Sequence, residues 1–220
     1  GLDVNLPDGQ YRRTALHSAS IEGHTGIVRM LLAHPSLTCQ NAVDSEGNSP
    51  LRLAANQGHE AVVELLLQQP GLDVNLAGER MLTALHEACH WGHAGIVRRL
   101  LAHPTLSCHN AVDRDGDSPL MLAVEWNNVE CVRELVAVEG VDLETRDSQG
   151  VGLEQVAKII GNGQEAWQVV REELGRREEQ RREERTRTLS VDMGNGCLFG
   201  DLTRSTDKFE IKVITKPTFK

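Results

Sequence analysis

Hydrophobic residues in the first part of the chain recur in short stretches with helical spacing. In the first stretch, Ile27 and Val28 are followed by Leu31 and Leu32, which places all four on one face of an α-helix. Equivalent stretches lie at 62–67 and 96–101. Prolines at positions 35, 70 and 104 follow these stretches, and the residue before a proline is pushed away from the helical region. The pattern therefore predicts a series of short amphipathic helices.

A second, shorter apolar segment precedes each of these stretches, and the two together form a repeating unit. The shorter segments are TALH, SPLR, TALH and SPLM, which begin at Thr14, Ser49, Thr83 and Ser118, with a weaker copy near Gly152. Gly-His, or Asn127-Asn128 in the fourth unit, separates the two helices of a unit. Turn segments with Asp and Gly, 44–47 and 113–116, precede the second and fourth units. Each unit is predicted to be a turn followed by two helices.

This order of signposts resembles the ankyrin repeat family, in which Thr-Pro-Leu-His, Gly-His and Asp-Val-Asn segments follow one another. The resemblance covers residues 1–163 and implies an all-α repeat solenoid of about five units, in which helix-turn-helix pairs are joined by hairpin-like turns. One unit cannot bury its apolar face alone, so stability is expected to come from stacking on neighbouring units. Residues 1–5 match the end of a preceding unit, so the repeat domain is expected to be incomplete at its N-terminus.

The pattern changes after the fourth unit. The fifth unit has Glu154 where the family has a core leucine, which is typical of a capping repeat with a polar outer face. Residues 164–187 continue as a charged helix without an apolar stripe, either a solvated helix or a coiled-coil or docking helix. The tail, 188–220, is expected to be disordered or to be a piece of a further domain, although 209–213 alternates like a strand.

Composition and charge narrow the classes of partner. Aromatic residues make up 3% of the chain, so the core is expected to consist of Leu, Val, Ala and Ile. The net charge is -9, and residues 1–163 carry 21 acidic and 11 basic side chains. Nucleic-acid binding depends on Lys and Arg displacing counterions from phosphates. The acidic repeat domain is therefore expected not to bind nucleic acid.

Cysteine use and the absence of targeting segments indicate a compartment. The five cysteines are odd in number and show no close pairing; they are Cys39, Cys89, Cys108, Cys131 and Cys197. No secretory leader opens the chain and no run of about 18 apolar residues could span a bilayer, so no membrane association is expected. These features favour a reducing, cytoplasmic location, with the nucleus as the alternative.

One segment matches a catalytic pattern. Residues 86–90 read His-Glu-Ala-Cys-His, and HExxH places two zinc-binding histidines and a general base on one helix. The repeat register offers another explanation, because His86 occupies the same place as His17 and its expected partner is Thr83. His86, Cys89, His90 and His93 also have the spacing of a structural zinc site, but His93 belongs to the Gly-His turn. Neither a metal, a cofactor nor a catalytic residue is predicted.

The positions that vary between units are expected to hold binding specificity. Trp91 and Trp126 occupy equivalent places in adjacent units, where the family usually has polar residues facing a groove. Exposed tryptophans are typical of binding hot spots, whereas the alternative is that each ring packs on the neighbouring helix. The expected rim around them is charged and mainly acidic, and it comprises Arg80, His90, Arg114, Asp115, Asp117 and Glu125.

The sequence thus predicts a non-enzymatic protein-binding module, a scaffold or adaptor that binds a protein partner in the concave face of the repeats. The acidic rim favours a basic, partly apolar segment as the partner. Two alternatives stay open: the repeats could select substrates for a larger enzyme such as a ubiquitin ligase, or the HExxH match could belong to a zinc peptidase. The sequence does not specify the oligomeric state.

Overall fold

A computed structural model describes residues 3–160 and 163–192 of the 220-residue chain. The described residues contain ten α-helices and one 3-10 helix, Cys108–Asn110. The α-helices are α1 Ala15–Ile21, α2 Thr25–Leu32, α3 Pro50–Asn56, α4 Glu60–Leu67, α5 Ala84–His90, α6 Ala94–Leu101, α7 Pro119–Glu125, α8 Val129–Val136, α9 Leu153–Ile160 and α10 Gln164–Asp192. The chain divides into two compact units, Gly1–Glu173 and Leu174–Lys220.

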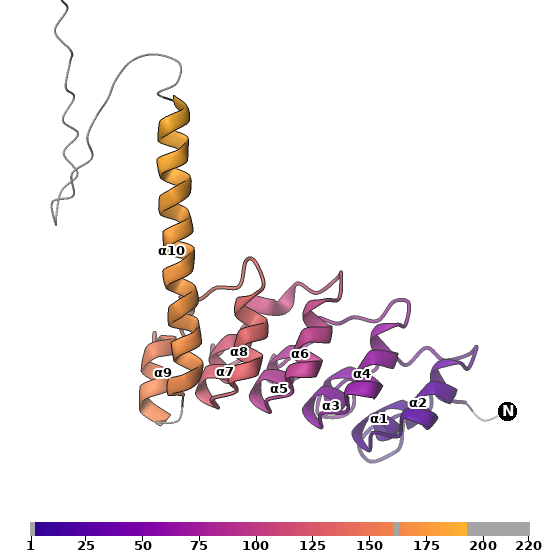
Figure 1. The fold of residues 1–220 in the computed structure, drawn as a ribbon. Helices are drawn as coiled ribbons and strands as arrows, with labels where there is room; N and C mark the ends of the chain where they lie inside the picture. The colour runs from indigo at the N-terminus through magenta and orange to yellow at the C-terminus, as the bar shows by residue number, and fades with distance from the viewer. Residues whose placement is uncertain (1–2, 161–162, 193–220) are drawn as a thin grey trace, which may run out of the picture. The chain divides into compact units, whose positions relative to one another are not determined.

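The first compact unit is a two-layered helical array. We call its odd-numbered helices the inner helices and its even-numbered helices, α2 to α8, the outer helices. Each odd-numbered helix from α1 to α9 contacts the next odd-numbered helix, and each even-numbered helix from α2 to α8 contacts the next even-numbered one (Figure 1). The two helices of a pair also contact each other, as α1 does with α2. The prediction of an all-α repeat solenoid is therefore confirmed.

The odd-numbered helices begin where the repeated Ser or Thr predicts. Ser49 accepts a hydrogen bond from the backbone N–H of Arg52 at 3.2 Å, and Ser118 does the same for Met121 at 3.3 Å. These side-chain bonds satisfy backbone donors that have no partner within the helix. In both units a proline occupies the first helical turn, where its missing N–H costs nothing.

The Gly-His turns connect each unit to the preceding one. Gly58 has a φ of +77°, and a Cβ there would lie 2.6 Å from the ring of His93. The Nε2 of His93 donates to the carbonyl of Asn56 at 3.2 Å, and the Nε2 of His59 donates to the carbonyl of Ile21 at 2.9 Å. The amide of Asn128 donates to the carbonyl of Cys89 at 2.7 Å. The glycine thus makes room for a side chain that ties together the ends of two inner helices.

A ladder of asparagine side chains joins the loops that leave the outer helices. The amide of Asn75 donates to the carbonyl of Thr105 at 2.9 Å, and its oxygen accepts from the N–H of Ser107 at 2.8 Å. The same pairing of one donated and one accepted backbone bond occurs at Asn5, Asn41 and Asn110. Because buried or loop backbone groups need partners, these asparagines fix the spacing between successive loops.

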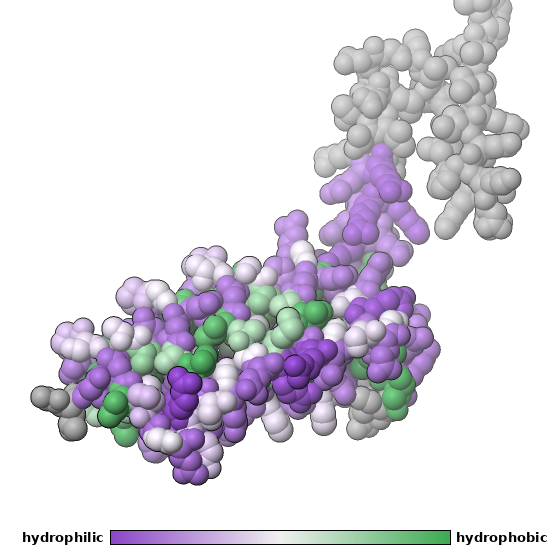
Figure 2. Space-filling model, turned by 180° about the vertical axis from the view of Figure 1, so that it is seen from behind, coloured by the Kyte–Doolittle hydropathy of each residue, from purple (hydrophilic) through white to green (hydrophobic). Residues whose placement is uncertain are grey.

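The core contains aliphatic and small side chains, as the composition predicts. Its largest fully buried apolar side chains are Leu16, Leu51, Leu66, Leu85, Ile96, Leu100, Leu120, Met121, Leu135 and Val28. They come from both layers of helices, so each unit contributes to a core that continues through its neighbours. Figure 2 shows one face of this array, on which hydrophobic side chains form an interrupted band between hydrophilic ones.

The last helix pair, α9 with the start of α10, combines exposed charged and apolar side chains with a small buried core; Ile159 of α9 is 75% exposed. Glu154 is exposed and forms an ion pair with Lys158 at 2.7 Å. Ala157 of α9 and Ala166 and Val170 of α10 are fully buried, and the N–H of Ala166 donates to the side-chain oxygen of Asn127 at 3.1 Å.

Within the second compact unit, α10 carries predominantly polar side chains, including Glu178 and Arg182, which approach to 4.0 Å. The tail was predicted to begin at 188, but α10 continues to Asp192. The rest of the predicted tail, 193–220, with the strand-like stretch at 209–213, lies outside the described residues. In the part of the chain that the structure describes, no helix is both long and apolar enough to cross a membrane.

Candidate functional site: an aromatic and acidic surface on α5 and α7

Two exposed tryptophans stand at the ends of neighbouring inner helices. Trp91 follows the last residue of α5 and is 56% exposed, and Trp126 follows the last residue of α7 and is 54% exposed. Their backbone N–H groups close the last helical turns by donating to the carbonyls of Glu87 and Leu122, at 3.0 and 3.1 Å. The backbone is therefore fixed by the helix, whereas more than half of each side chain is available to a partner.

The imidazole of His90 lies between the two indoles. Its ring centre is 4.9 Å from that of Trp91 and 4.8 Å from that of Trp126. These are distances at which aromatic rings attract each other through edge-to-face or tilted contacts. Trp126 therefore contacts a residue of the neighbouring helix α5, whereas Trp91 contacts a residue of its own helix, and both keep an exposed surface. We call these three residues the aromatic cluster.

Two partly buried carboxylates lie beside the aromatic cluster. Burial, together with the nearby carboxylates of Asp113 and Glu125, raises the pKa of Asp117 to about 6. Burial also raises the pKa of Glu125, while the nearby His90 opposes that rise. Asp117 thus interacts electrostatically with Glu125, and Glu125 with His90 of the aromatic cluster. Ionised carboxylates are disfavoured there unless a cation approaches.

The remaining predicted site residues lie on the turns that precede α5 and α7. The guanidinium of Arg80 forms an exposed ion pair with Asp115 at 2.8 Å. The N–H of Arg114 donates to the carbonyl of Arg80 at 3.0 Å, and the N–H of Ser148 donates to the carbonyl of Asp115 at 3.1 Å. Successive turns are therefore joined through their backbones. An exposed pair such as Arg80 with Asp115 contributes little to stability. The guanidinium of Arg80 is, however, already engaged with a carboxylate of this surface.

A buried ion pair near this surface was not predicted from the sequence. The Nε of Arg52 lies 3.0 Å from Glu87, and the amide of Asn56 donates to the other oxygen of Glu87 at 2.8 Å. The charged side chains are only 11% and 10% exposed. In the sequence, Arg52 stands where His86 stands in the next unit, and Glu87 directly follows His86. This combination of a cation and an acid in successive units is the only signal for the pair. Hydrophobic periodicity does not reveal such a pair.

The HExxH segment is structural, as the repeat register predicts. His86 is buried, with Nδ1 2.8 Å from the hydroxyl of Thr83 and Nε2 3.1 Å from the carbonyl of Ala111. Both of its ring nitrogens are thus engaged, while His90 packs between tryptophans and His93 donates to a carbonyl. Among the described residues, no group of three or more His, Cys, Asp or Glu side chains could hold a metal ion. Glu87, the would-be base, is committed to Arg52.

The cysteines inside the array are packing residues. Cys39, Cys89, Cys108 and Cys131 are all buried free thiols, and Cys197 lies outside the described residues. Burial raises the pKa of Cys131 to about 12 and that of Cys89 well above its usual range. Because the thiolate is the reactive form, these side chains are poor nucleophiles.

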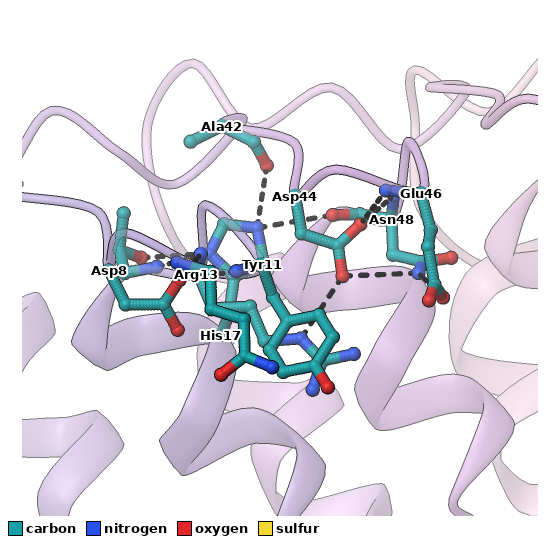
Figure 3. Close-up of polar contacts among 10 residues, drawn as sticks. Asp8, Tyr11, Arg13, His17, Ala42, Asp44, Glu46 and Asn48 are labelled. Atoms are coloured by element: carbon teal, nitrogen blue, oxygen red, sulfur yellow. Dashed lines mark hydrogen bonds and ion pairs between the residues drawn. The ribbon is translucent and has the colours of Figure 1, made fainter.

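The sequence repeats with a period of 69 residues, so the turn that contains Asp44, before α3, is equivalent to the turn that contains Asp113, before α7. The turn in this first copy has a charge-balanced set of side chains (Figure 3). The Nε of Arg13 and the amide of Asn48 both approach the same oxygen of Asp44, each at 3.2 Å. The Nε2 of His17 lies 3.1 Å from the carbonyls of both Ala42 and Asn48. This turn therefore has a cation and an amide donor for its buried carboxylate. Burial raises the pKa of Asp44, but the backbone and side-chain hydrogen bonds from Asn48, the backbone N–H of Glu46 and the side chain of Arg13 together lower it.

We expect Asp117→Asn to raise the unfolding free energy at pH 7 by about 1 kcal/mol, after allowance for solvent screening. The folded-state pKa of about 6 lies above the ordinary value of 3.8, so ionisation of Asp117 destabilises the native state. Asn48 occupies the equivalent place in the first copy, where its amide donates to Asp44. Urea unfolding at pH 7 and pH 4.5 provides the measurement.

The gain from Asp117→Asn should shrink as the pH falls through 6, because Asp117 of the parent protein then becomes protonated. Asp115→Asn is the matched control, since it removes an exposed carboxylate of the same turn that has Arg80 as its partner. An equal gain at both pH values, or an equal gain in the control, would contradict this prediction.

Comparison with protein families agrees with the architecture. The helix pairs, the Gly-His connections and the joined turns define a class of protein, the α-helical repeat solenoid. A family model described as ankyrin repeats (3 copies) matches residues 1–78 and 72–147. The chain belongs to the ankyrin repeat family. Ankyrin repeats are generally protein–protein interaction modules and are typically not catalytic.

Proposed function

We propose that this chain is a scaffold or adaptor that binds a protein partner along the concave side of its inner helices, with Trp91 and Trp126 as the principal contacts. The supporting observation is that both indoles are more than half exposed although they sit on fixed ends of α5 and α7. Exposing two large aromatic side chains side by side is unfavourable in water, and hot spots are enriched in tryptophan.

The same proposal gives the flanking segments their roles. Residues 1–163 form the repeat domain of about five units, in which α9 belongs to the capping unit, and the start of α10, which follows at Gln164, completes that cap. The exposed ion pair of Glu154 with Lys158 supports that role, because a cap needs a polar outer side. Residues 164–187 belong to the charged helix α10, which continues to Asp192, and the remainder of 188–220 is the tail. The binding residues are those of the aromatic cluster and its rim.

The test compares the parent chain with a Trp91→Ala, Trp126→Ala double variant. Affinity capture followed by mass spectrometry identifies proteins retained by the parent, and the dissociation constant of each purified protein is then measured for both chains. We expect the double variant to bind about a hundredfold more weakly, because two hot-spot side chains are removed. Circular dichroism and thermal unfolding verify that the variant is folded.

A Leu6→Ala, Met30→Ala variant is the matched control. These two side chains are also large, apolar and exposed, at 69% and 68%, but they lie on the first unit. If the control loses as much affinity as the tryptophan variant, or if the folded tryptophan variant binds all proteins as tightly as the parent, the proposed site is wrong.

A further inference from the structure

The long repeat allows the two equivalent turns to be compared position by position. Gly-Ile-Val-Arg begins at residue 26 and again at 95, a separation of 69 residues, and the same separation relates Asp44 to Asp113. It also relates Arg13 to Leu82 and Asn48 to Asp117. The first turn is shown in Figure 3, where Arg13 and Asn48 both point toward the carboxylate of Asp44.

The second turn keeps the buried carboxylate but loses both of its side-chain partners. Asp113 still accepts the backbone N–H groups of Asp115 and Asp117, each at 2.9 Å, as Asp44 does in its own turn. Leucine replaces the cation, however, and a second carboxylate replaces the amide donor. The equivalent positions therefore carry no net charge in the first copy and two negative charges in the second.

The surroundings of Asp117 add further negative charge. The charged groups that act most strongly on it are the carboxylates of Asp113, Glu125, Asp147 and Asp115, which come from its own turn, from α7 and from the next turn. His90 of α5 faces Glu125, and Arg80 of the preceding turn is paired with Asp115. Glu125 directly precedes the exposed Trp126 in the chain, and His90, which interacts electrostatically with Glu125, lies 4.8 Å from the indole of Trp126.

We infer that the partner places an arginine side chain beside Asp117 and Glu125 while its apolar neighbours cover Trp91 and Trp126; this inference rests on the proposed function. A guanidinium can donate to two carboxylates at once and can stack on an indole face, and it loses less hydration than an ammonium group. The incoming cation would bring to this acidic group the positive charge that Arg13 brings to Asp44 in the first copy, where the second copy has Leu82 in the equivalent place.

Binding of this kind depends on pH in a defined direction. Because burial and neighbouring carboxylates hold the pKa of Asp117 near 6, it is ionised at pH 7.5 and protonated at pH 5. Protonation removes the charge that attracts the guanidinium, so affinity should fall as the pH falls.

The probe is a peptide selected from a display library of random twelve-residue peptides panned against the full chain at pH 7.5. Binders that are lost on the Trp91→Ala, Trp126→Ala variant are kept, and each arginine of the tightest one is replaced in turn by citrulline, its neutral isostere. We expect one such replacement to weaken binding to the parent about tenfold. The same replacement should change affinity less than twofold on an Asp117→Asn, Glu125→Gln variant.

Failure of the arginine inference and failure of the proposed function give different results in this experiment. If the selected peptides depend on both tryptophans but contain no basic residue, or if citrulline is tolerated by the parent, the arginine inference is overturned while the binding surface stands. If no peptide depends on the tryptophans, both are overturned. Affinity of the arginine peptide that is equal at pH 7.5 and pH 5 would also count against Asp117 as the contact.

Discussion

Replacement of Glu87 by alanine is expected to lower the unfolding free energy by about 3 kcal/mol, because removing one member of a buried ion pair leaves the other charge unpaired. The side chain of Arg52 is only 11% exposed, and its Nε lies 3.0 Å from Glu87. Its Nη1 is already buried without a hydrogen-bond partner among the described residues. Asn56 would also lose the acceptor of its amide at 2.8 Å. Urea unfolding at pH 7 measures the loss.

The chain itself offers the matched control for this prediction. Met121 and Leu122 occupy in the fourth unit the places that Arg52 and Glu87 occupy in the second and third, and both are buried. An Arg52→Met, Glu87→Leu variant should therefore recover most of the stability that Glu87→Ala loses, since a buried pair can be replaced by apolar side chains at little cost. A double variant less stable than the single one would show that the ion pair itself contributes net stability.

The sequence predicted those features of the fold that repeat. The hydrophobic stretches located the outer helices, and Ser49 and Ser118 located the starts of two inner ones. The place of His86 in the register predicted its contact with Thr83, which the 2.8 Å distance confirms. These features depend on local chain geometry and on a register that recurs, so one unit informs the next.

The features that the sequence did not predict depend on side chains in different units. Asn75 reaches the loop around Thr105, and Arg52 reaches Glu87; in both cases the partners are far apart in sequence and meet only when units stack. In the candidate site, the exposure of the tryptophans does not contradict the prediction, but the position of His90 between them follows from side-chain rotamers. No periodic pattern encodes such a choice.

Substitution of His86 by alanine is expected to lower the unfolding free energy by about 3 kcal/mol, combining a cavity with lost buried hydrogen bonds. His86 is fully buried, and its removal leaves the hydroxyl of Thr83 and the carbonyl of Ala111 without the imidazole that now joins them. The measurement is urea unfolding at pH 7.5. Alanine at the partly exposed His103 is a suitable control for loss of an imidazole, and a similar small effect at both positions would contradict the structural role of His86.

The charge state of His86 links stability to pH with a definite sign. Burial lowers its pKa below the ordinary value of 6.5, so the native state binds its proton less readily than the unfolded chain. Stability from His86 is therefore complete above pH 6.5 and is lost as the pH falls below it. Asp117 acts in the opposite direction near pH 6, so the parent alone does not isolate the effect.

A His86→Met variant separates the two contributions, because Met121 already fills the equivalent place in the fourth unit. We expect the unfolding free energy of the parent, relative to that variant, to decrease between pH 7.5 and pH 5, since only the parent must keep a buried imidazole neutral at the lower pH. Buried His17 shows the same lowered pKa for the same reason and should respond in the same way when it is replaced. If the difference between parent and variant is constant over this range, the neutral buried state of His86 is wrong, and with it the assignment of the HExxH histidine to the frame of the repeat.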